Sequence, residues 1–501
     1  MFNVLYDTHM ASKGYSGIPQ DTRLLLKTLA SAPGVSVDAL IHPTQYDPHR
    51  SPDAVSTFDA SLALQREAQP RAVKAPNAFK RFRRNLRSSW RNLRRGSNAY
   101  ALGTLDSDLL FDTIWRLRLD QSLPASDREM MRALTYKYSP ISEEELVNFG
   151  VKSRTSRKLD TAGYDFLLFQ DTRLVQANPA TTKIIRYHDP LPVISPDTFD
   201  GDWLLKWHFN AVKKAQKDSF FVCNSSVTQD QLIKLFPKLE GRSFVIPYTL
   251  PDLPSYQIPD INISTILERR RSFASAPKTR NKPDLPREPK YIVMVSTLEP
   301  RKNFPGAIEA FERLVARNND EDLRFVIVGK PGWAFENIFA AMSSGVKSGR
   351  IIHLTGLTFP ELANVYRKAE ALVFPSYGEG FGFTPMEALQ FGTPGVVSDI
   401  PVHRWVMGDA VLYASPYDPS AVAAQLERLL YGPEAAIVRK NLLSRSSSVL
   451  SRYTIEATSN QWFNLFERLQ RAKGTRPAGF PALISDRDPN ILMPSSSIGC
   501  Q

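Results

Sequence analysis

The chain has 501 residues, of which 42% are hydrophobic, and it carries a formal net charge of +12. This length exceeds what one hydrophobic core usually holds, so it predicts two domains with insertions, while the apolar content is that of an ordinary globular protein rather than a membrane-embedded or fibrous one. The excess of positive charge indicates an anionic partner.

The cysteine content points to a reducing compartment. Cys223 and Cys500 are too few and too far apart in sequence for a disulfide framework or a cysteine-based metal site, so we expect a cytoplasmic protein. Residues 1–6 lack the basic and long apolar regions of a signal peptide, and they predict a first strand instead. We expect no segment to span a bilayer, because none is long and apolar enough.

The first 250 residues predict one α/β domain. A strand at 2–6 leads through Gly14-Tyr-Ser-Gly17 to a helix at 20–30, and a Gly-rich loop of this kind either contacts a phosphate or serves only as a tight connection. A helix near Gln229 is expected to be capped by Ser225 or Ser226. Further strands are expected at 166–169, 183–187, 220–224 and 244–247.

A basic insertion is expected at about 45–150, where the pattern is polar and irregular. Within it, residues 71–95 hold ten Lys or Arg and no Asp or Glu, and their apolar side chains recur every three or four positions, as on one helix face. Such a helix suits an anionic membrane, as at the inner face of the cytoplasmic membrane. Alternatively, its apolar face packs within the insertion, or its charge binds nucleic acid. The expected membrane contacts are Phe79, Phe82, Arg83, Arg84, Arg87, Trp90 and Arg91.

His188 follows the strand at 183–187, within the segment His188-Asp189-Pro190. Open α/β sheets bind ligands at the carboxyl ends of their strands, so a neutral histidine there could contact a ligand hydroxyl. The alternative is that its ring is bonded to a nearby carbonyl group. The sequence leaves both interpretations open.

The second half is expected to contain a linker at 251–290, rich in proline and mixed charge, and a doubly wound parallel sheet at 291–453. A helix at 454–473 and a disordered tail at 474–501 are expected to follow. The strands of this sheet are expected at 291–295, 323–328, 351–354, 371–374, 395–397 and 410–413. Its helices are expected at 304–317, 360–368 and 420–430.

The stretch from Tyr377 to Leu389, YGEGFGFTPMEAL, joins the strand at 371–374 to a helix with Pro385 in its first turn. Such a unit places unpaired backbone N–H groups and the positive end of a helix at the carboxyl edge of a sheet, where a diphosphate can bind without a metal. Its three glycines let the backbone approach a ligand closely. The loop is therefore a predicted phosphate site.

Two cations and two carboxylates are expected at this same edge. Arg301 and Lys302 follow the strand at 291–295, and adjacent cations there can neutralise a departing diphosphate. Alone, such a pair is usually a solvated surface feature. It indicates a binding site here only because the Glu379 loop is expected at the same edge of the sheet. Glu379 in the loop and Glu387 on the helix can accept hydrogen bonds from vicinal hydroxyls.

Several motifs together resemble retaining glycosyltransferases of family 4. They are the Glu379-x7-Glu387 spacing with Glu-Gly-Phe-Gly, Glu299-Pro-Arg-Lys-Asn303 upstream, and Ser398-Asp-Ile-Pro401 and Gly408-Asp-Ala410 downstream. The likeness is strong over 290–430. It extends loosely to the Gly14–Gly17 loop and to His188-Asp189-Pro190, which resembles mannosyltransferase-like members. The resemblance implies the GT-B fold, two Rossmann-like domains facing each other across a cleft.

The resemblance also implies a reaction. A hexose, with mannose favoured, moves from a nucleoside-diphosphate sugar to a saccharide or lipid-linked acceptor with retention at the anomeric carbon, as in polysaccharide or glycolipid synthesis. Glu379 would hold the donor sugar, Glu387 the ribose, and His188 would lie near the reacting sugar. The other donor-binding residues implied are Gly17, Arg301, Lys302, Gly380, Phe381, Gly382 and Phe383. Neither a metal nor a cofactor is implied, and the acceptor is expected on the first domain.

Other functions fit parts of the sequence. A metal-dependent transferase would need an Asp-x-Asp pair at a strand end. Residues 106–108, 200–202 and 486–488 have this pattern of residues, but none of them follows a convincing buried strand. A sugar-nucleotide epimerase or phosphorylase could use the same fold. A non-catalytic protein that binds membrane or nucleic acid would explain residues 71–95 but leave the motifs of the second half unexplained.

Overall fold

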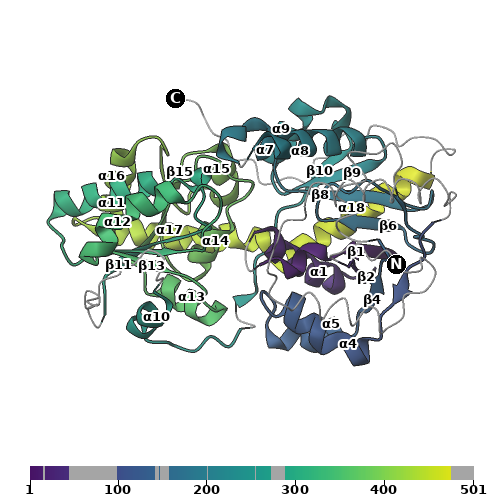
Figure 1. The fold of residues 1–501 in the computed structure, drawn as a ribbon, viewed down its shortest axis with the longest axis horizontal. Helices are drawn as coiled ribbons and strands as arrows, with labels where there is room; N and C mark the ends of the chain where they lie inside the picture. Colours follow the sequence, from purple (N-terminus) through teal and green to yellow (C-terminus); the bar gives the residue numbers. More distant parts are fainter. Residues whose placement is uncertain are drawn as a thin grey trace, which may run out of the picture.

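The computed structural model describes residues 1–14, 17–43, 99–141, 146, 157–199, 201–253, 256–271 and 288–474. Two largely parallel sheets, each packed against helices, lie side by side in two domains (Figure 1). A separate pair of short strands, β5 (Arg157–Lys158) and β7 (Val175–Gln176), accompanies the first sheet. None of the helices in these ranges is long and apolar enough to cross a membrane.

The first sheet has the strand order β10-β9-β8-β6-β1-β2-β4-β3, and only β3 runs antiparallel to its neighbour. The chain passes from β1 to β2 and β4 on one side and then crosses to β6 and β8 on the other, so the topological switch point lies between β1 and β6. Its strands are β1 (Phe2–Asp7), β2 (Val35–Ile41), β3 (Gly103–Thr104), β4 (Thr135–Tyr138), β6 (Phe166–Phe169), β8 (Thr182–Tyr187), β9 (Ser219–Cys223) and β10 (Ser243–Val245).

The helices of the first domain begin with the features that the sequence indicates. Gly17 precedes α1 with φ 69°, in the region that favours glycine, and Ser225 caps α9 by accepting from the Thr228 amide at 3.1 Å. The helices are α1 (Ile18–Ser31), α4 (Ser107–Ile114), α5 (Arg128–Arg132), α7 (Leu191–Ile194), α8 (Asp202–Ala215) and α9 (Ser226–Leu235).

The second sheet has the order β13-β12-β11-β14-β15-β16 and is parallel throughout, so its switch point lies between β11 and β14. Its central strands are buried, as expected for apolar strands covered on both faces. The strands are β11 (Tyr291–Val295), β12 (Arg324–Val328), β13 (Ile351–Leu354), β14 (Ala371–Phe374), β15 (Gly395–Ser398) and β16 (Leu412–Ala414). The helices are α11 (Phe304–Asn318), α12 (Glu336–Ser348), α13 (Phe359–Arg367), α14 (Phe383–Gln390), α15 (Pro401–Met407), α16 (Pro419–Leu430) and α17 (Ala435–Leu450).

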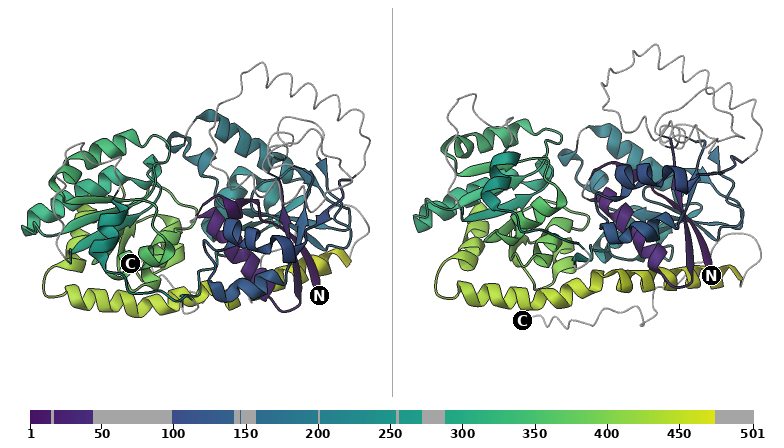
Figure 2. Two further views of the ribbon diagram at one scale, coloured as in Figure 1. Left: turned by 60° about the horizontal axis from the view of Figure 1, so that its bottom comes forward. Right: turned by 90° about the horizontal axis from the view of Figure 1, so that it is seen from below.

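The last helix, α18 (Ile455–Gly474), returns to the first domain, so α17 and α18 run along one side of both domains (Figure 2). Phe466 stacks on Phe166 of β6 with ring centroids 4.5 Å apart. The Leu250 amide, in the first passage of the chain between domains, donates to the Tyr453 carbonyl in the second passage at 2.8 Å. The two passages of the chain between the domains are therefore hydrogen-bonded to each other.

Two expected boundaries are wrong in part. Residues 103–138 do not belong to an irregular insertion, because β4 pairs with β2 in the main sheet. The expected linker at 251–290 contains α10 (Ile263–Arg270), whose Arg270 forms an ion pair with Glu361 of the second domain at 2.8 Å. The basic stretch 71–95 with its expected membrane contacts, the tail beyond Gly474 and the Asp-x-Asp segment at 486–488 lie outside the described residues.

Candidate active site

The loops that follow β11 and β14 meet at the switch point of the second sheet. Arg301 and Lys302 lie in a short 3-10 turn after β11. The next residue, Asn303, has φ 58° and caps α11, and its side-chain amide donates to the carbonyls of Pro375 at 3.1 Å and Pro416 at 2.8 Å. Asn303 thus ties the β11 loop to the β14 loop, which fixes the two cations beside the glycine-rich segment.

Glu379 lies between the two cations. Its carboxylate accepts from Arg301 Nη1 at 2.8 Å and from Lys302 Nζ at 2.6 Å, while Arg301 Nη2 donates to Glu299 at 2.7 Å. The side chains of these residues are between 6% and 14% exposed. The four groups therefore form one ion cluster with little access to water.

The electrostatics of this cluster favour an ionised Glu379. Burial would raise the pKa of Glu379, but the charges of Arg301 and Lys302 outweigh burial and hold this pKa well below its usual range. Burial lowers the pKa of Lys302, and it raises the pKa of Glu299. The cations are thus already paired with carboxylates, and an incoming anion would compete with Glu379 for them.

The glycine-rich loop contacts the first domain closely. A Cβ at Gly380 would lie 2.7 Å from the His188 carbonyl oxygen, so any larger residue would force the backbones apart. Gly382 precedes α14 with φ 100°. Phe381 and Phe383 pack on Tyr248 of the first domain, with ring centroids 4.7 and 4.8 Å away. These contacts place the amino end of α14 against the first domain.

His188 lies at the end of β8, and both of its ring nitrogens have partners. Nε2 lies 2.6 Å from the Gln170 carbonyl oxygen, and Nδ1 lies 2.5 Å from the Tyr248 hydroxyl. Because a carbonyl only accepts, the proton lies on Nε2 and the tyrosine hydroxyl donates to Nδ1. Burial lowers the pKa of His188. Of the two interpretations left open by the sequence, this geometry matches the histidine bonded to a carbonyl.

Glu387 connects the two domains. Its carboxylate accepts from Gln20 Nε2 at 2.8 Å and from the Tyr366 hydroxyl at 3.1 Å, and burial raises its pKa. Gln20 lies in the first turn of α1, three residues after Gly17, so the start of α1 faces the second domain. Sequence analysis missed Gln20, although its place directly after the Gly-rich loop was the available signal.

The residues expected near the donor therefore lie together in the structure, on facing loops of the two domains. Within the described ranges no three His, Cys, Asp or Glu side chains are grouped as metal ligands would be. Asp106 of one Asp-x-Asp segment caps α4 by accepting from the Leu109 amide at 3.2 Å. That segment marks a helix start rather than the end of a buried strand.

Residues 275–442, which hold the ion cluster and the loop, match the family described as glycosyl transferases group 1. The second domain is a group 1 glycosyltransferase domain. The sequence is also similar to mannosyltransferases. It is 27% identical over 229 residues to the O-antigen chain mannosyltransferase RfbU of Salmonella typhimurium, with 45% of this chain and 59% of that protein covered.

Two other relatives match over shorter stretches. O-antigen chain mannosyltransferase B of Escherichia coli is 28% identical over 36% of this chain and 46% of that protein. The serotype-specific mannosyltransferase WbdA of Escherichia coli is 32% identical over 32% of this chain and 19% of that protein. The chain thus covers 19% to 59% of the length of these three relatives.

Solved structures extend the likeness to both domains. Sucrose-phosphate synthase from Thermosynechococcus elongatus, at 16% identity, covers 94% of this chain and is itself covered completely, with a TM-score of 0.51. Anabaena Alr3699/HepE in complex with UDP and glucose, at 13% identity, covers 93% of this chain with a TM-score of 0.52 and is also fully covered. The expected GT-B fold, with two Rossmann-like domains, is confirmed.

Proposed function

We propose that this chain is a retaining glycosyltransferase that moves a hexose, with mannose favoured, from a nucleoside-diphosphate sugar to a saccharide or lipid-linked acceptor. The bond from the anomeric carbon to the phosphate oxygen breaks, and its electron pair stays on the diphosphate. The acceptor oxygen bonds to the same face of that carbon, and the hydroxyl proton passes to the departing phosphate. The mannosyltransferases among the relatives support mannose and polysaccharide synthesis.

The observation that carries the proposal is the convergence of Arg301, Lys302 and Glu379 at the β11–β14 switch point, where open α/β sheets bind ligands. The diphosphate takes over the two cations, helped by the amino end of α14 and by the backbone N–H groups of Gly380 to Phe383, where the loop leads into this helix. Glu379 is then released from both cations. Its carboxylate becomes free to accept hydrogen bonds from hydroxyls of the donor sugar.

The other site residues take supporting roles in this proposal. Glu387 exchanges its bond with Gln20 for the ribose hydroxyls, and Gly17 lets the α1 loop approach the phosphate. The sugar contact of His188 requires one of its present partners to be exchanged. Charge neutralisation by Arg301, Lys302 and α14 makes the reaction independent of a metal ion.

A nucleotide-binding and turnover assay tests the proposal. GDP or UDP should raise the melting temperature of the full chain equally with and without EDTA, and loss of that shift on chelation would refute the metal-free site. Incubation with GDP-mannose and other sugar nucleotides should release the nucleoside diphosphate, and proton NMR of the product should show the anomeric configuration of the donor. An inverted product would contradict retention.

We also propose that the basic stretch 71–95 brings the enzyme to the anionic inner face of the cytoplasmic membrane. Replacing Arg83, Arg84, Arg87 and Arg91 by Glu should abolish cosedimentation with phosphatidylglycerol vesicles while leaving GDP binding unchanged. Equal sedimentation of both proteins would exclude this role for the stretch.

A further inference from the structure

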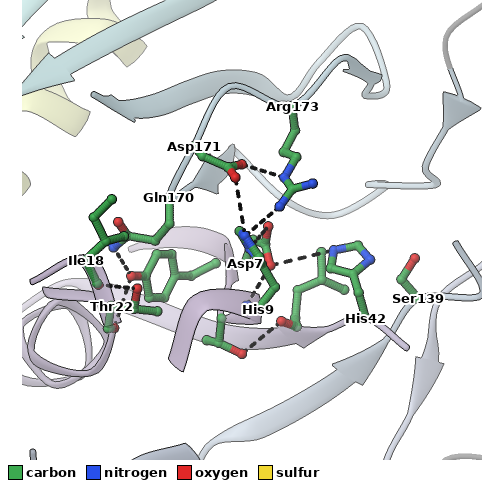
Figure 3. Close-up of polar contacts among 12 residues, drawn as sticks. Asp7, His9, Ile18, Thr22, His42, Ser139, Gln170, Asp171 and Arg173 are labelled. Carbon is green, nitrogen blue, oxygen red and sulfur yellow. Dashed lines mark hydrogen bonds and ion pairs between the residues drawn. The ribbon is translucent and has the colours of Figure 1, made fainter. Parts of the chain in front are cut away.

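A second polar cluster occupies the switch point of the first sheet. Asp7 is the last residue of β1 and His9 follows this strand, while Asp171 and Arg173 follow β6, the strand that pairs with β1 on the opposite side from β2. Figure 3 shows these four side chains converging from the two loops, with His42 from the end of β2 beside them. The cluster does not belong to the proposed donor site.

The cluster is joined by close polar contacts. His9 Nδ1 lies 2.9 Å from Asp7 Oδ2, and Arg173 Nη2 lies 2.6 Å from His9 Nε2. Arg173 Nε forms an ion pair with Asp171. Since an arginine only donates, His9 carries its proton on Nδ1, toward Asp7, and offers Nε2 to the guanidinium. His9 Nε2 also lies 3.4 Å from Asp171 Oδ2, so the two carboxylates, the imidazole and the guanidinium form one closed cluster.

Two features distinguish this chain of contacts from a satisfied structural network. Arg173 Nη1 is buried and has no hydrogen-bond partner among the residues that the structure describes, although buried polar groups are nearly always paired. Asp171 is 27% exposed, whereas Asp7, His9 and Arg173 are at most 2% exposed. The cluster therefore has an unused donor inside and a carboxylate open to solvent at its edge.

The cluster occupies the same place in the first sheet as the proposed donor site occupies in the second. In the second sheet, Arg301 follows one switch-point strand and pairs with Glu379, which follows the other. In the first sheet, Asp7 ends one switch-point strand and His9 follows it, and His9 contacts Arg173 and Asp171 after the other. The neighbouring residue, Gln170, accepts the hydrogen bond from His188, whose carbonyl approaches Gly380. The cluster thus adjoins the surface where the two domains meet.

We propose that Asp171 and Arg173 form a binding site for an uncharged saccharide, the acceptor end of the reaction, an inference that rests on the proposed function. Asp171 accepts from a sugar hydroxyl, and the unpartnered Nη1 of Arg173 donates to a neighbouring oxygen. A carboxylate and a guanidinium held side by side supply the acceptor and donor that a vicinal diol needs. His9 and Asp7 are positioning residues that hold the guanidinium in place.

The charges explain why the ligand is a neutral sugar rather than a phosphate. Two carboxylates face one guanidinium, and both are ionised, because the nearby cationic and imidazole groups outweigh burial and hold the pKa of Asp7 and that of Asp171 below their usual range. Burial lowers the pKa of His42, so this ring adds no positive charge at neutral pH. Burial would lower the pKa of His9, but the carboxylates of Asp7 and Asp171 outweigh burial and raise it, so the positive groups of the cluster are already matched by its carboxylates. The cluster therefore offers an anion no uncompensated cation, whereas hydroxyl groups can bind to it.

The variant Asp171→Asn tests the site, because it keeps the shape and removes the charge. The matched control is Asp218→Asn, since Asp218 also pairs with a buried cation, Lys183 at 2.9 Å, but precedes β9 and thus lies at the opposite edge of the same sheet. Binding of the methyl glycosides of mannose, glucose, galactose, rhamnose and N-acetylglucosamine to the full chain is measured by saturation-transfer NMR. GDP affinity is measured separately by calorimetry.

We expect saturable binding of at least one glycoside to the wild type and to Asp218→Asn. Asp171→Asn should weaken it by about tenfold or more, as for the loss of a hydrogen bond to a charged group, with GDP affinity unchanged. Equal glycoside affinity in Asp171→Asn and wild type, or no saturable binding of any glycoside to the wild type, would overturn the inference. Failure of GDP to bind the wild type would instead count against the proposed function.

Discussion

Glu379 occupies the cations that a diphosphate needs, so the carboxylate and the donor compete for Arg301 and Lys302. We predict that Glu379→Gln lowers turnover by about 100- to 1,000-fold, the range for losing a group that acts on the reacting centre. The same variant should bind GDP as tightly as the wild type or more tightly, because a neutral amide no longer holds the cations. Calorimetry and a turnover assay measure the two effects.

A matched control for this prediction is Glu309→Gln, since Glu309 pairs with Arg313 at 2.6 Å on the exposed surface of the same domain. It should change neither GDP affinity nor turnover, because exposed pairs contribute little. If Glu379→Gln bound GDP more weakly than Glu309→Gln, Glu379 would assist diphosphate binding, and the exchange of partners would be wrong.

His403 makes stability depend on pH. It is fully buried, its Nδ1 lies 3.0 Å from the Ser398 carbonyl oxygen, and burial lowers its pKa to about 4. Between about pH 6.5 and pH 4 the unfolded chain takes up a proton there and the folded chain does not, so stability falls as the pH falls. The loss should approach 3 kcal/mol, at about 1.36 kcal/mol per pKa unit.

Urea denaturation at pH 7 and pH 4.5 measures this dependence. The free energy of unfolding of His403→Asn should fall less over this interval than that of the wild type, because asparagine does not titrate. The two proteins are compared by the change in their free energy of unfolding between pH 7 and pH 4.5, since the substitution also changes the absolute stability. An equal change in the free energy of unfolding in the two proteins would show that His403 takes up its proton equally in the folded and the unfolded chain.

The docking of α18 joins the end of the second domain to the first. Phe466 is fully buried and stacks on Phe166. We predict that Phe466→Ala lowers the free energy of unfolding by about 3–5 kcal/mol, as other buried Phe-to-Ala changes do. Ile437→Ala on α17 is the control, because Ile437 is 60% exposed and should cost at most about 0.5 kcal/mol. Urea denaturation compares the two, and similar losses would contradict the packing role of α18.

The sequence predicted elements whose signal is local. The apolar strands at 166–169, 291–295, 351–354 and 371–374 have the predicted bounds, because a strand covered on both faces is an uninterrupted apolar run. β4 was missed because its residues, Thr-Tyr-Lys-Tyr, alternate in burial and carry a lysine. Its place in the sheet depends on pairing with β2, which lies about a hundred residues earlier and which no local pattern reveals.

The residues proposed to bind the donor could be singled out from the sequence because their motif is contiguous or lies just after a strong strand. Gln20 and the cluster of Asp7, His9, Asp171 and Arg173 were not, since the contacts of Gln20 with Glu387 and of His9 with Arg173 join residues far apart in the chain. The Gly-rich loop before Gln20 indicates the position of this residue, but only the structure shows Glu387 opposite it. The ion pairs of Glu379 with its cations were likewise beyond sequence reasoning, which placed these groups at one edge but not in contact.

The two domains also meet through Trp333, in the loop after β12. Its ring stacks on Phe199 with centroids 5.7 Å apart and an interplanar angle of 16°, and Nε1 donates to the Thr198 carbonyl at 2.9 Å. The Gln20–Glu387 hydrogen bond is a further link between the domains. Trp333 therefore contributes to closure without belonging to the proposed donor site.

We predict that Trp333→Ala opens the nucleotide-free protein and raises its radius of gyration in solution scattering. Turnover should fall by about 10- to 100-fold, because donor and acceptor are held on different domains and small misplacements are costly. GDP affinity should stay unchanged, since the cations and Glu387 remain. Trp203→Ala is the control, because Trp203 is 65% exposed on α8, and it should alter none of these quantities. Wild-type scattering together with reduced GDP affinity would place Trp333 in the donor site itself and remove it from the closure contact.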